Sequence, residues 1–156
     1  MKIQNCVQFL QKNKFKIALV AGGIIALFVA VHLVSHHGTD RRVFYYAVSG
    51  SSKSQKEIRY LTKNPVQGKL EYYVDELILG PTFYRGRPLF TVGTKLDSCF
   101  VQDSVLYVGL SEDAVLQDGD SLELMQAVAL FKKNIKKNFS RIKKIELFID
   151  GNYIPD

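Results

Sequence analysis

The sequence predicts an α+β protein in which an N-terminal transmembrane helix precedes a small domain of mixed strands and helices. Three observations predict this class. Residues 17–34 are apolar and uncharged, short runs of strand length recur after residue 43, and two amphipathic helical patterns lie between those runs. The expected order after the apolar run is β-β-α-β-β-α-β. Its simplest packing is one small mixed sheet with both helices on one face.

The apolar run has the length and flanks of a membrane anchor. Fifteen of its 18 residues are Ala, Val, Ile, Leu or Phe, and as a helix it would be about 27 Å long, close to the thickness of a bilayer core. Lys2, Lys12, Lys14 and Lys16 precede it without an acidic residue. This charge bias predicts a single-pass protein with its N-terminus inside and its C-terminal domain outside the cytoplasm.

The main alternative is a cleaved signal peptide. The run is long for one, and no small-x-small cleavage site follows it, which favours an uncleaved anchor. The expected organisation is therefore a basic cytoplasmic tail at 1–16, an anchor at 17–34, a spacer at 35–42 and an extracytoplasmic domain at 43–156.

Four small residues recur at every fourth position of the anchor, which places them on one helix face: Ala18, Gly22, Ala26 and Ala30. Such a stripe lets two membrane helices pack closely, so self-association is one hypothesis. Ala and Gly are also common in membrane helices that do not associate.

The charge and cysteine content exclude some classes of protein. The chain carries a net charge of +6, of which residues 41–156 contribute +3, from 17 basic and 14 acidic side chains. This charge is too low for a dedicated nucleic-acid-binding domain. Cys6 and Cys99 lie on opposite sides of the anchor and cannot pair within one chain. Cys99 is expected to be a small buried side chain, although pairing between chains stays open.

The helices and strands of the outer domain are predicted from the spacing of apolar residues and from the residues that begin or end a helix. Asn64-Pro65 is expected to open the first helix and Gly80-Pro81 to end it. Asp120, with Glu123 three residues later, resembles a capping box that opens the second helix. Alternating or apolar runs predict strands at 43–48, 57–63, 95–101, 105–110 and 142–150.

These elements carry a family resemblance. Residues 43–151 resemble a GerMN domain, the module of spore germination and sporulation proteins. The resemblance rests on the stretches 44–46, 77–81, 93–96, 107–111 and 145–151. It implies a module held at the outer face of a bacterial cytoplasmic membrane, without catalysis and with interaction as its role. It supplies no catalytic residues to transfer to this chain.

The residues themselves also argue against an enzyme. All three histidines, His32, His36 and His37, lie in or beside the anchor, so the domain has no Ser-His-Asp triad, Cys-His pair or HExxH zinc site. The acidic run that contains Asp113 and Asp118 fits no calcium loop. We therefore expect no catalytic activity, no metal and no cofactor.

Two groups of residues are candidate binding sites. Tyr, Phe and Arg are enriched at interface centres, and one loop combines them: Phe83, Tyr84, Arg85, Arg87 and Phe90. The alternative is that Phe83 and Phe90 belong to the core. The second group is basic and surrounds the end of the second helix: Lys132, Lys133, Lys136, Lys137, Arg141, Lys143 and Lys144. Cations are favoured at a helix C-terminus, but they could also contact anionic lipid, wall polymer or an acidic protein.

Two functions are therefore expected. The first is docking of envelope proteins, with a second copy of the chain as one such partner, while residues 17–34 lie in membrane lipid. The second is binding of cell-wall glycan or its anionic polymers. No aromatic residue alternates with the lysines in the sequence, so nucleic acid is not an expected partner.

Overall fold

The computed structural model describes residues 14–35, 38–116, 119 and 121–155. The chain divides into two compact units, residues 1–38 and 39–156. The expected basic tail, apart from its last residues, and Asp118 and Asp120 lie outside the described residues.

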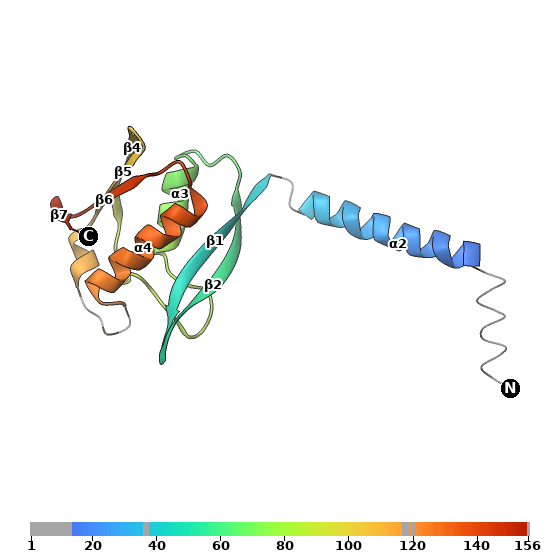
Figure 1. The fold of residues 1–156 in the computed structure, drawn as a ribbon, viewed down its shortest axis with the longest axis horizontal. Coiled ribbons are helices and arrows are strands. Elements are labelled where there is room, and N and C mark those ends of the chain that lie inside the picture. The colour runs from blue at the N-terminus through green and yellow to red at the C-terminus, as the bar shows by residue number, and fades with distance from the viewer. Residues whose placement is uncertain (1–13, 36–37, 117–118, 120, 156) are drawn as a thin grey trace. The chain divides into compact units, whose positions relative to one another are not determined.

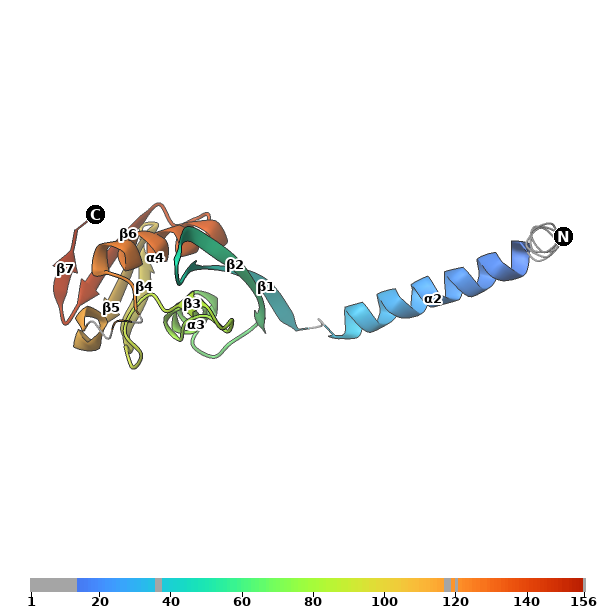
Figure 2. The same ribbon diagram turned by 90° about the horizontal axis from the view of Figure 1, so that it is seen from below.

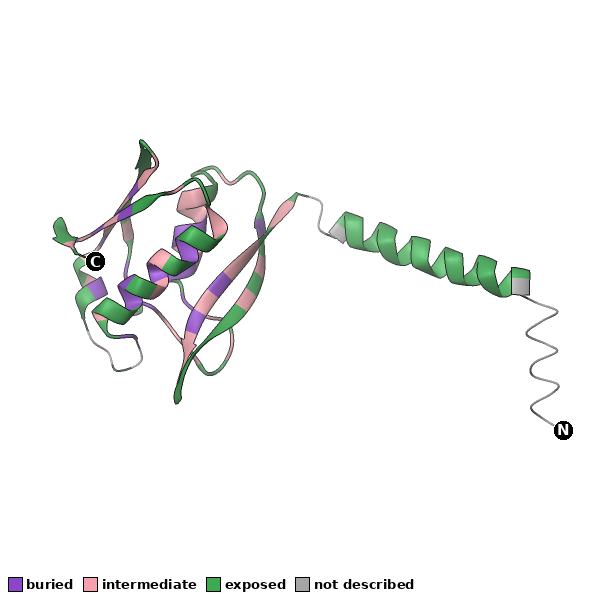
Figure 3. Cartoon of the chain, in the orientation of Figure 1, coloured by how far each residue is buried: buried purple, intermediate pink, exposed green. Residues whose placement is uncertain are grey.

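The first unit contains helix α2, Lys14–Ser35. Its stretch Phe15–Val34 has a mean hydropathy of 2.7 and none of it is buried, as Figure 3 shows by its uniform green colour. A core helix of a soluble domain would be mostly buried, whereas a membrane anchor or a signal sequence would have this composition and exposure. A Cβ atom added at Gly22 would meet nothing within 4 Å, so the small-residue stripe of the anchor stays a prediction.

The second unit confirms the α+β class but contains two sheets where the sequence predicted one (Figures 1 and 2). The strand orders are β2-β1-β3 and β4-β5-β6-β7. Two helices and one 3₁₀ turn, η1, complete the described part of this unit. The elements in chain order are β1 Thr39–Val48, β2 Ser51–Thr62, α3 Lys69–Ile78, β3 Gly86–Arg87, β4 Leu96–Gln102, β5 Val105–Leu110, η1 Glu112–Val115, α4 Leu124–Asn138, β6 Lys144–Ile149 and β7 Asn152–Ile154.

Both helices begin later than the sequence predicted. Gly68 has a φ of 91°, a conformation that a helix cannot include, and its amide donates to the Pro65 carbonyl in a turn. Helix α3 therefore begins at Lys69 and not at Asn64-Pro65. Helix α4 begins at Leu124, and Glu123 is extended and serves as its N-cap without a side-chain hydrogen bond. Glu123 is therefore not the third residue of the helix, as the predicted capping box required.

One core joins the elements of the second unit. Phe44 and Tyr46 of β1 are fully buried, and the Phe44 ring stacks on Tyr73 of α3 with centroids 4.6 Å apart. The inward side chains of β5 and β6 and the apolar face of α4, which includes Phe131, join the same cluster. All residues of this cluster lie between 44 and 149, so the domain has a complete core without α2.

Candidate interaction surfaces

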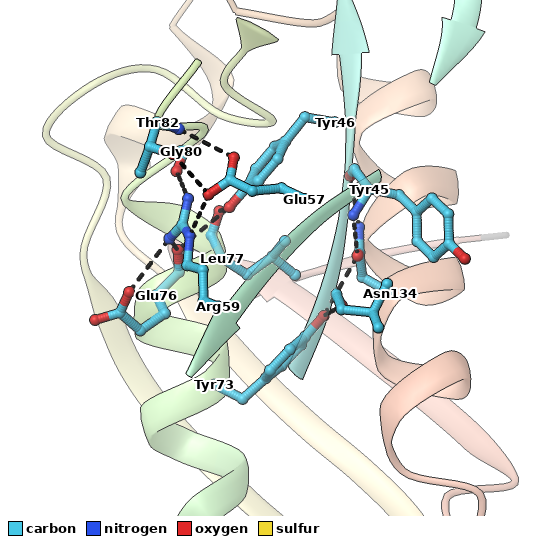
Figure 4. Close-up of polar contacts among 11 residues, drawn as sticks. Tyr45, Tyr46, Glu57, Arg59, Tyr73, Glu76, Leu77, Gly80, Thr82 and Asn134 are labelled. Carbon is cyan, nitrogen blue, oxygen red and sulfur yellow. Dashed lines mark hydrogen bonds and ion pairs between the residues drawn. The ribbon is translucent and has the colours of Figure 1, made fainter. Parts of the chain in front are cut away.

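Helix α4 covers one edge of β1 through two asparagines. The Asn134 side chain accepts a hydrogen bond from the Tyr45 amide at 2.7 Å and donates to the Tyr45 carbonyl at 2.9 Å. One turn later, Asn138 forms the same pair with the amide and carbonyl of Val43, at 3.0 and 2.7 Å. Each carboxamide thus replaces one residue of a neighbouring strand. Figure 4 shows Asn134 between α4 and β1.

This pairing explains why the β structure divides into two sheets. The other edge of β1 pairs with β2 along its whole length. Beside α4, β1 pairs with a strand only at Ala47 and Val48, which face β3. The two asparagines satisfy the backbone groups that a further strand would have bonded. No strand of the second sheet can therefore join here.

The same pairing builds a basic hollow with an aromatic ring at its side. The Lys133 ammonium lies 4.7 Å from the centroid of the Tyr45 ring and donates to the Ser54 hydroxyl at 3.3 Å. A cation above an aromatic face is an attractive contact. The open hollow beside it is lined by Tyr45, Ala129, Lys132, Lys133, Lys136 and Lys137.

The hollow continues onto the exposed side of the β1–β2 hairpin. Because side chains alternate along a strand, Tyr45 points away from the buried pair Phe44 and Tyr46. Cross-strand register places Lys56 opposite Tyr45, and Ile58 opposite Val43. Ile58 and Tyr60 remain 41% and 47% exposed. We call this surface the outer face, and it comprises Arg41, Val43, Tyr45, Lys56, Ile58, Tyr60, Lys133, Lys136 and Lys137, without a carboxylate among them.

The opposite side of the hairpin holds a partly buried arginine, Arg59, that no sequence motif indicated. The Arg59 guanidinium bonds to the carboxylates of Glu57 and Glu76, at 2.5 and 3.2 Å, and to the carbonyl of Gly80. It lies 4.7 Å from the centroid of the Phe44 ring. Figure 4 shows the hydrogen bonds of Arg59 with Glu57, Glu76 and Gly80 at the C-terminal end of α3. The cluster therefore fastens β2 to α3.

Electrostatics support a structural role for this cluster. Burial alone would raise the pKa of Glu57, but hydrogen bonds from Arg59 and from the amide and hydroxyl of Thr82 outweigh burial and lower it. Burial raises the pKa of Tyr46, whose hydroxyl donates to the Leu77 carbonyl. The carboxylate is thus held charged and the phenol neutral. The spacing of Glu57 and Arg59, two residues apart on one strand face, was the available signal in the sequence.

The aromatic loop does not form one surface. Phe90 is 1% exposed and packs against Phe131 in the core, so its prediction as a partner-binding residue is wrong. Phe83 is half-buried against the same core. Tyr84 is fully exposed.

The two arginines of this loop hold it against its neighbours. Arg85 exchanges two hydrogen bonds with the backbone of Ser49 and remains exposed, and Arg87 donates to the Ser121 carbonyl. A docking role for Tyr84 and Arg85 stays a prediction.

The seven basic residues predicted around the end of the second helix also do not form one surface. Lys132, Lys133, Lys136 and Lys137 line the hollow on α4, whereas Arg141 lines a second hollow with Arg42 and Lys69. The amides of Lys143 and Lys144 bond to the Ser104 carbonyl, and the Lys144 ammonium pairs with Glu146 at 2.5 Å. The structure therefore brings together four of the seven predicted cations. Among the described residues, no three His, Cys, Asp or Glu side chains gather as a metal site would require.

These features define a small α+β domain with a cationic exposed face and a closed core, preceded by an apolar helix. Residues 42–154 match the family described as "Germane: Sporulation and spore germination". The chain belongs to this family, and its GerMN-type module is the one expected from the sequence.

Solved structures support the fold. The first GerMN domain of the sporulation protein GerM from Bacillus subtilis is similar with a TM-score of 0.52 and 20% identity, over 74% of this chain and 86% of that one. The tandem GerMN domains of the same protein give a TM-score of 0.56 and 11% identity, over 74% of this chain and 40% of the tandem. At these identities the likeness shows the fold alone. A comparison with curated proteins found no match.

Proposed function

We propose that this chain is a single-pass protein of a bacterial cytoplasmic membrane, with its N-terminus inside. Its extracytoplasmic domain is a non-catalytic module that docks other envelope proteins. The apolar and unburied α2 supports the anchor, the cationic flank before it supports the orientation, and membership of a sporulation and germination family supports the envelope setting.

The outer face carries the docking proposal. It combines Tyr45, Ile58 and Tyr60 with several lysines and has no carboxylate. Interface centres are enriched in aromatic residues that bury a large area at a low entropic cost, and the surrounding lysines select a partner of opposite charge. The partner that fits is a protein segment with acidic and apolar side chains.

The second candidate is an anionic wall polymer. The hollow on α4 favours it, because four lysines there surround an open surface that a chain of phosphate groups could follow. A polymer of this kind would use the lysines but would gain nothing from Ile58 and Tyr60. The apolar half of the face therefore favours a protein.

Site-specific photo-crosslinking in the native membrane tests the proposal. A photoreactive side chain at Tyr60 should give discrete adducts with membrane or envelope proteins, and a Lys133→Glu substitution should abolish them. Tyr153 on β7 is the matched control, because it is also 47% exposed but lies outside the outer face, and it should give none. Loss of the adducts in a Tyr45→Ala variant would locate the contact further.

Three outcomes would count against protein docking at this face. Tyr60 adducts could be absent, they could equal those from Tyr153, or they could contain only wall polymer, which would establish the second candidate. Adducts from a photoreactive side chain at Tyr84, without any from Tyr60, would move docking to the aromatic loop.

A further inference from the structure

The end of the domain that is joined to α2 carries its own group of cations. Arg41 and Arg42 lie at the start of β1, Lys63 follows β2, Lys69 opens α3 and Arg141 follows α4. These five residues come from four segments of the chain, and we call them the basic end. A hollow at this end is lined by the cations Arg42, Lys69 and Arg141 and by the apolar side chains of Leu70, Phe139 and Ile142.

Two cations of this hollow, Arg42 and Lys69, are held by contacts with neighbouring residues. The Arg42 guanidinium lies 4.8 Å from the centroid of the Phe139 ring and donates to the Asn138 carbonyl at 3.2 Å. Lys69 pairs with Asp40 at 2.9 Å, and this hydrogen bond lowers the pKa of Asp40. Asp40 also pairs with Arg42 at 3.4 Å. Lys63 also acts on Asp40. The five cations of the basic end thus include three that act on one carboxylate, and among the residues named here positive charge exceeds negative charge.

The covalent connection limits how far this end can be from the anchor. Helix α2 ends at Ser35 and β1 begins at Thr39. Four steps of fully extended chain span at most about 14 Å. The interfacial layer on each side of a bilayer core is roughly 5–7 Å thick. With α2 in a bilayer, the start of β1 therefore lies at or near the lipid headgroups in any orientation of the domain.

We propose that the basic end binds the phosphate groups of anionic lipids in the membrane that holds α2. Arginine and lysine hold such phosphates at a membrane surface, and each cation near the surface strengthens the attraction about fivefold. The apolar lining of the hollow suits the less polar part of a lipid headgroup region. The inference rests on the membrane anchor of the proposed function but not on its docking partner.

The test uses the full chain in nanodiscs made either of phosphatidylcholine alone or of phosphatidylcholine with phosphatidylglycerol. A lipid with a paramagnetic headgroup broadens amide signals near the bilayer. Thr39 is close to the lipid because of its connection alone, so the informative amides are Lys69, Leu70 and Arg141. Their broadening should increase severalfold with phosphatidylglycerol and should decrease with added salt. Lys53 is about 30 Å further along the hairpin, and its amide should not change.

Two variants of equal charge separate a specific contact from a general charge effect. Arg41→Glu with Arg141→Glu should remove the increase, because two fivefold contributions change sign. Lys53→Glu with Lys95→Glu changes the net charge equally at exposed sites away from the basic end, and it should keep the increase.

Several outcomes would overturn the inference. The first is equal broadening of the amide signals in both kinds of nanodisc, and the second is an equal loss of the increase in both variants. The third is a change in the Arg141 amide chemical shift with inorganic phosphate, in neutral nanodiscs, that matches the change with phosphatidylglycerol. The last outcome would assign the hollow to a soluble phosphate. A chain that failed to enter nanodiscs would instead refute the anchor of the proposed function.

Discussion

Replacing Asn134 with alanine should show how much the asparagine pairing contributes to stability. Asn134 is fully buried, and its carboxamide bonds both backbone groups of Tyr45, the Leu130 carbonyl and the Tyr73 hydroxyl. In Asn134→Ala the amide and carbonyl of Tyr45 lose their partners on this edge of β1. Each unsatisfied buried group costs about 1–3 kcal/mol, so the free energy of unfolding should fall by about 2–6 kcal/mol.

Urea unfolding of residues 39–156, followed by circular dichroism, measures this change. Lys133→Ala is the matched control, because it lies on the same helix one position away, is exposed, and should lose only the contact with the Tyr45 ring and a hydrogen bond to Ser54, about 1 kcal/mol. Asn138→Ala removes the equivalent pair at Val43 from a half-buried position, so its effect should be intermediate. The reasoning fails if Asn134→Ala is no more destabilising than Lys133→Ala.

Three further predictions concern other parts of the domain. Because the pKa of Glu57 is lower in the folded domain than in the unfolded chain, its charge stabilises the fold above the ordinary carboxyl pKa of 4.5 and this contribution is lost as the pH falls through the folded pKa. Glu57→Gln should therefore unfold at a lower urea concentration at pH 7 and lose less stability on acidification, and an unchanged pH profile would contradict this. Gly86→Ala should destabilise the domain by about 1–3 kcal/mol, since its Cβ would lie 2.4 Å from the Pro81 ring, and equal thermal midpoints for variant and parent would contradict this. Burial, assisted by the negative charges of Glu71 and Asp75, raises the pKa of Cys99 to about 12. Iodoacetamide at pH 8, followed by mass spectrometry, should therefore label Cys99 far more slowly in the folded domain than in the urea-unfolded domain. Equal labelling rates in the two states would contradict this.

The sequence predicted features whose cause is local. The apolar run became α2, the strand predicted at 43–48 lies within β1, and β5 formed at the predicted residues 105–110. Each depends on composition or on period within one stretch of chain. Strand β3 has only two residues, which is too few to show an alternating pattern in the sequence. It is recognised as a strand only by its pairing with Ala47 and Val48 of β1.

The surfaces depended on contacts between distant segments. Lys133 and Tyr45 lie 88 positions apart, and the pairing of Asn134 and Asn138 with β1 brings them together. In the sequence the lysines therefore lacked aromatic neighbours, although the fold supplies one. For Phe90 the sequence left a docking role and a core position open, since nothing within its own loop shows that Phe131 covers it.

Side chains of β1 that pack in the core alternate with side chains that face the proposed docking surface. Phe44 and Tyr46 point into the core and are fully buried, whereas Val43 and Tyr45 point to the outer face. Asn134 holds Tyr45 through its backbone alone, so Tyr45→Ala keeps those hydrogen bonds and removes only the ring beneath Lys133. We therefore expect Tyr45→Ala to unfold within about 1 kcal/mol of the parent while losing the crosslinks from Tyr60, and Tyr46→Ala to lose about 3–5 kcal/mol. If Tyr45→Ala lost both stability and crosslinks, the outer face would be part of the fold rather than a surface for a partner.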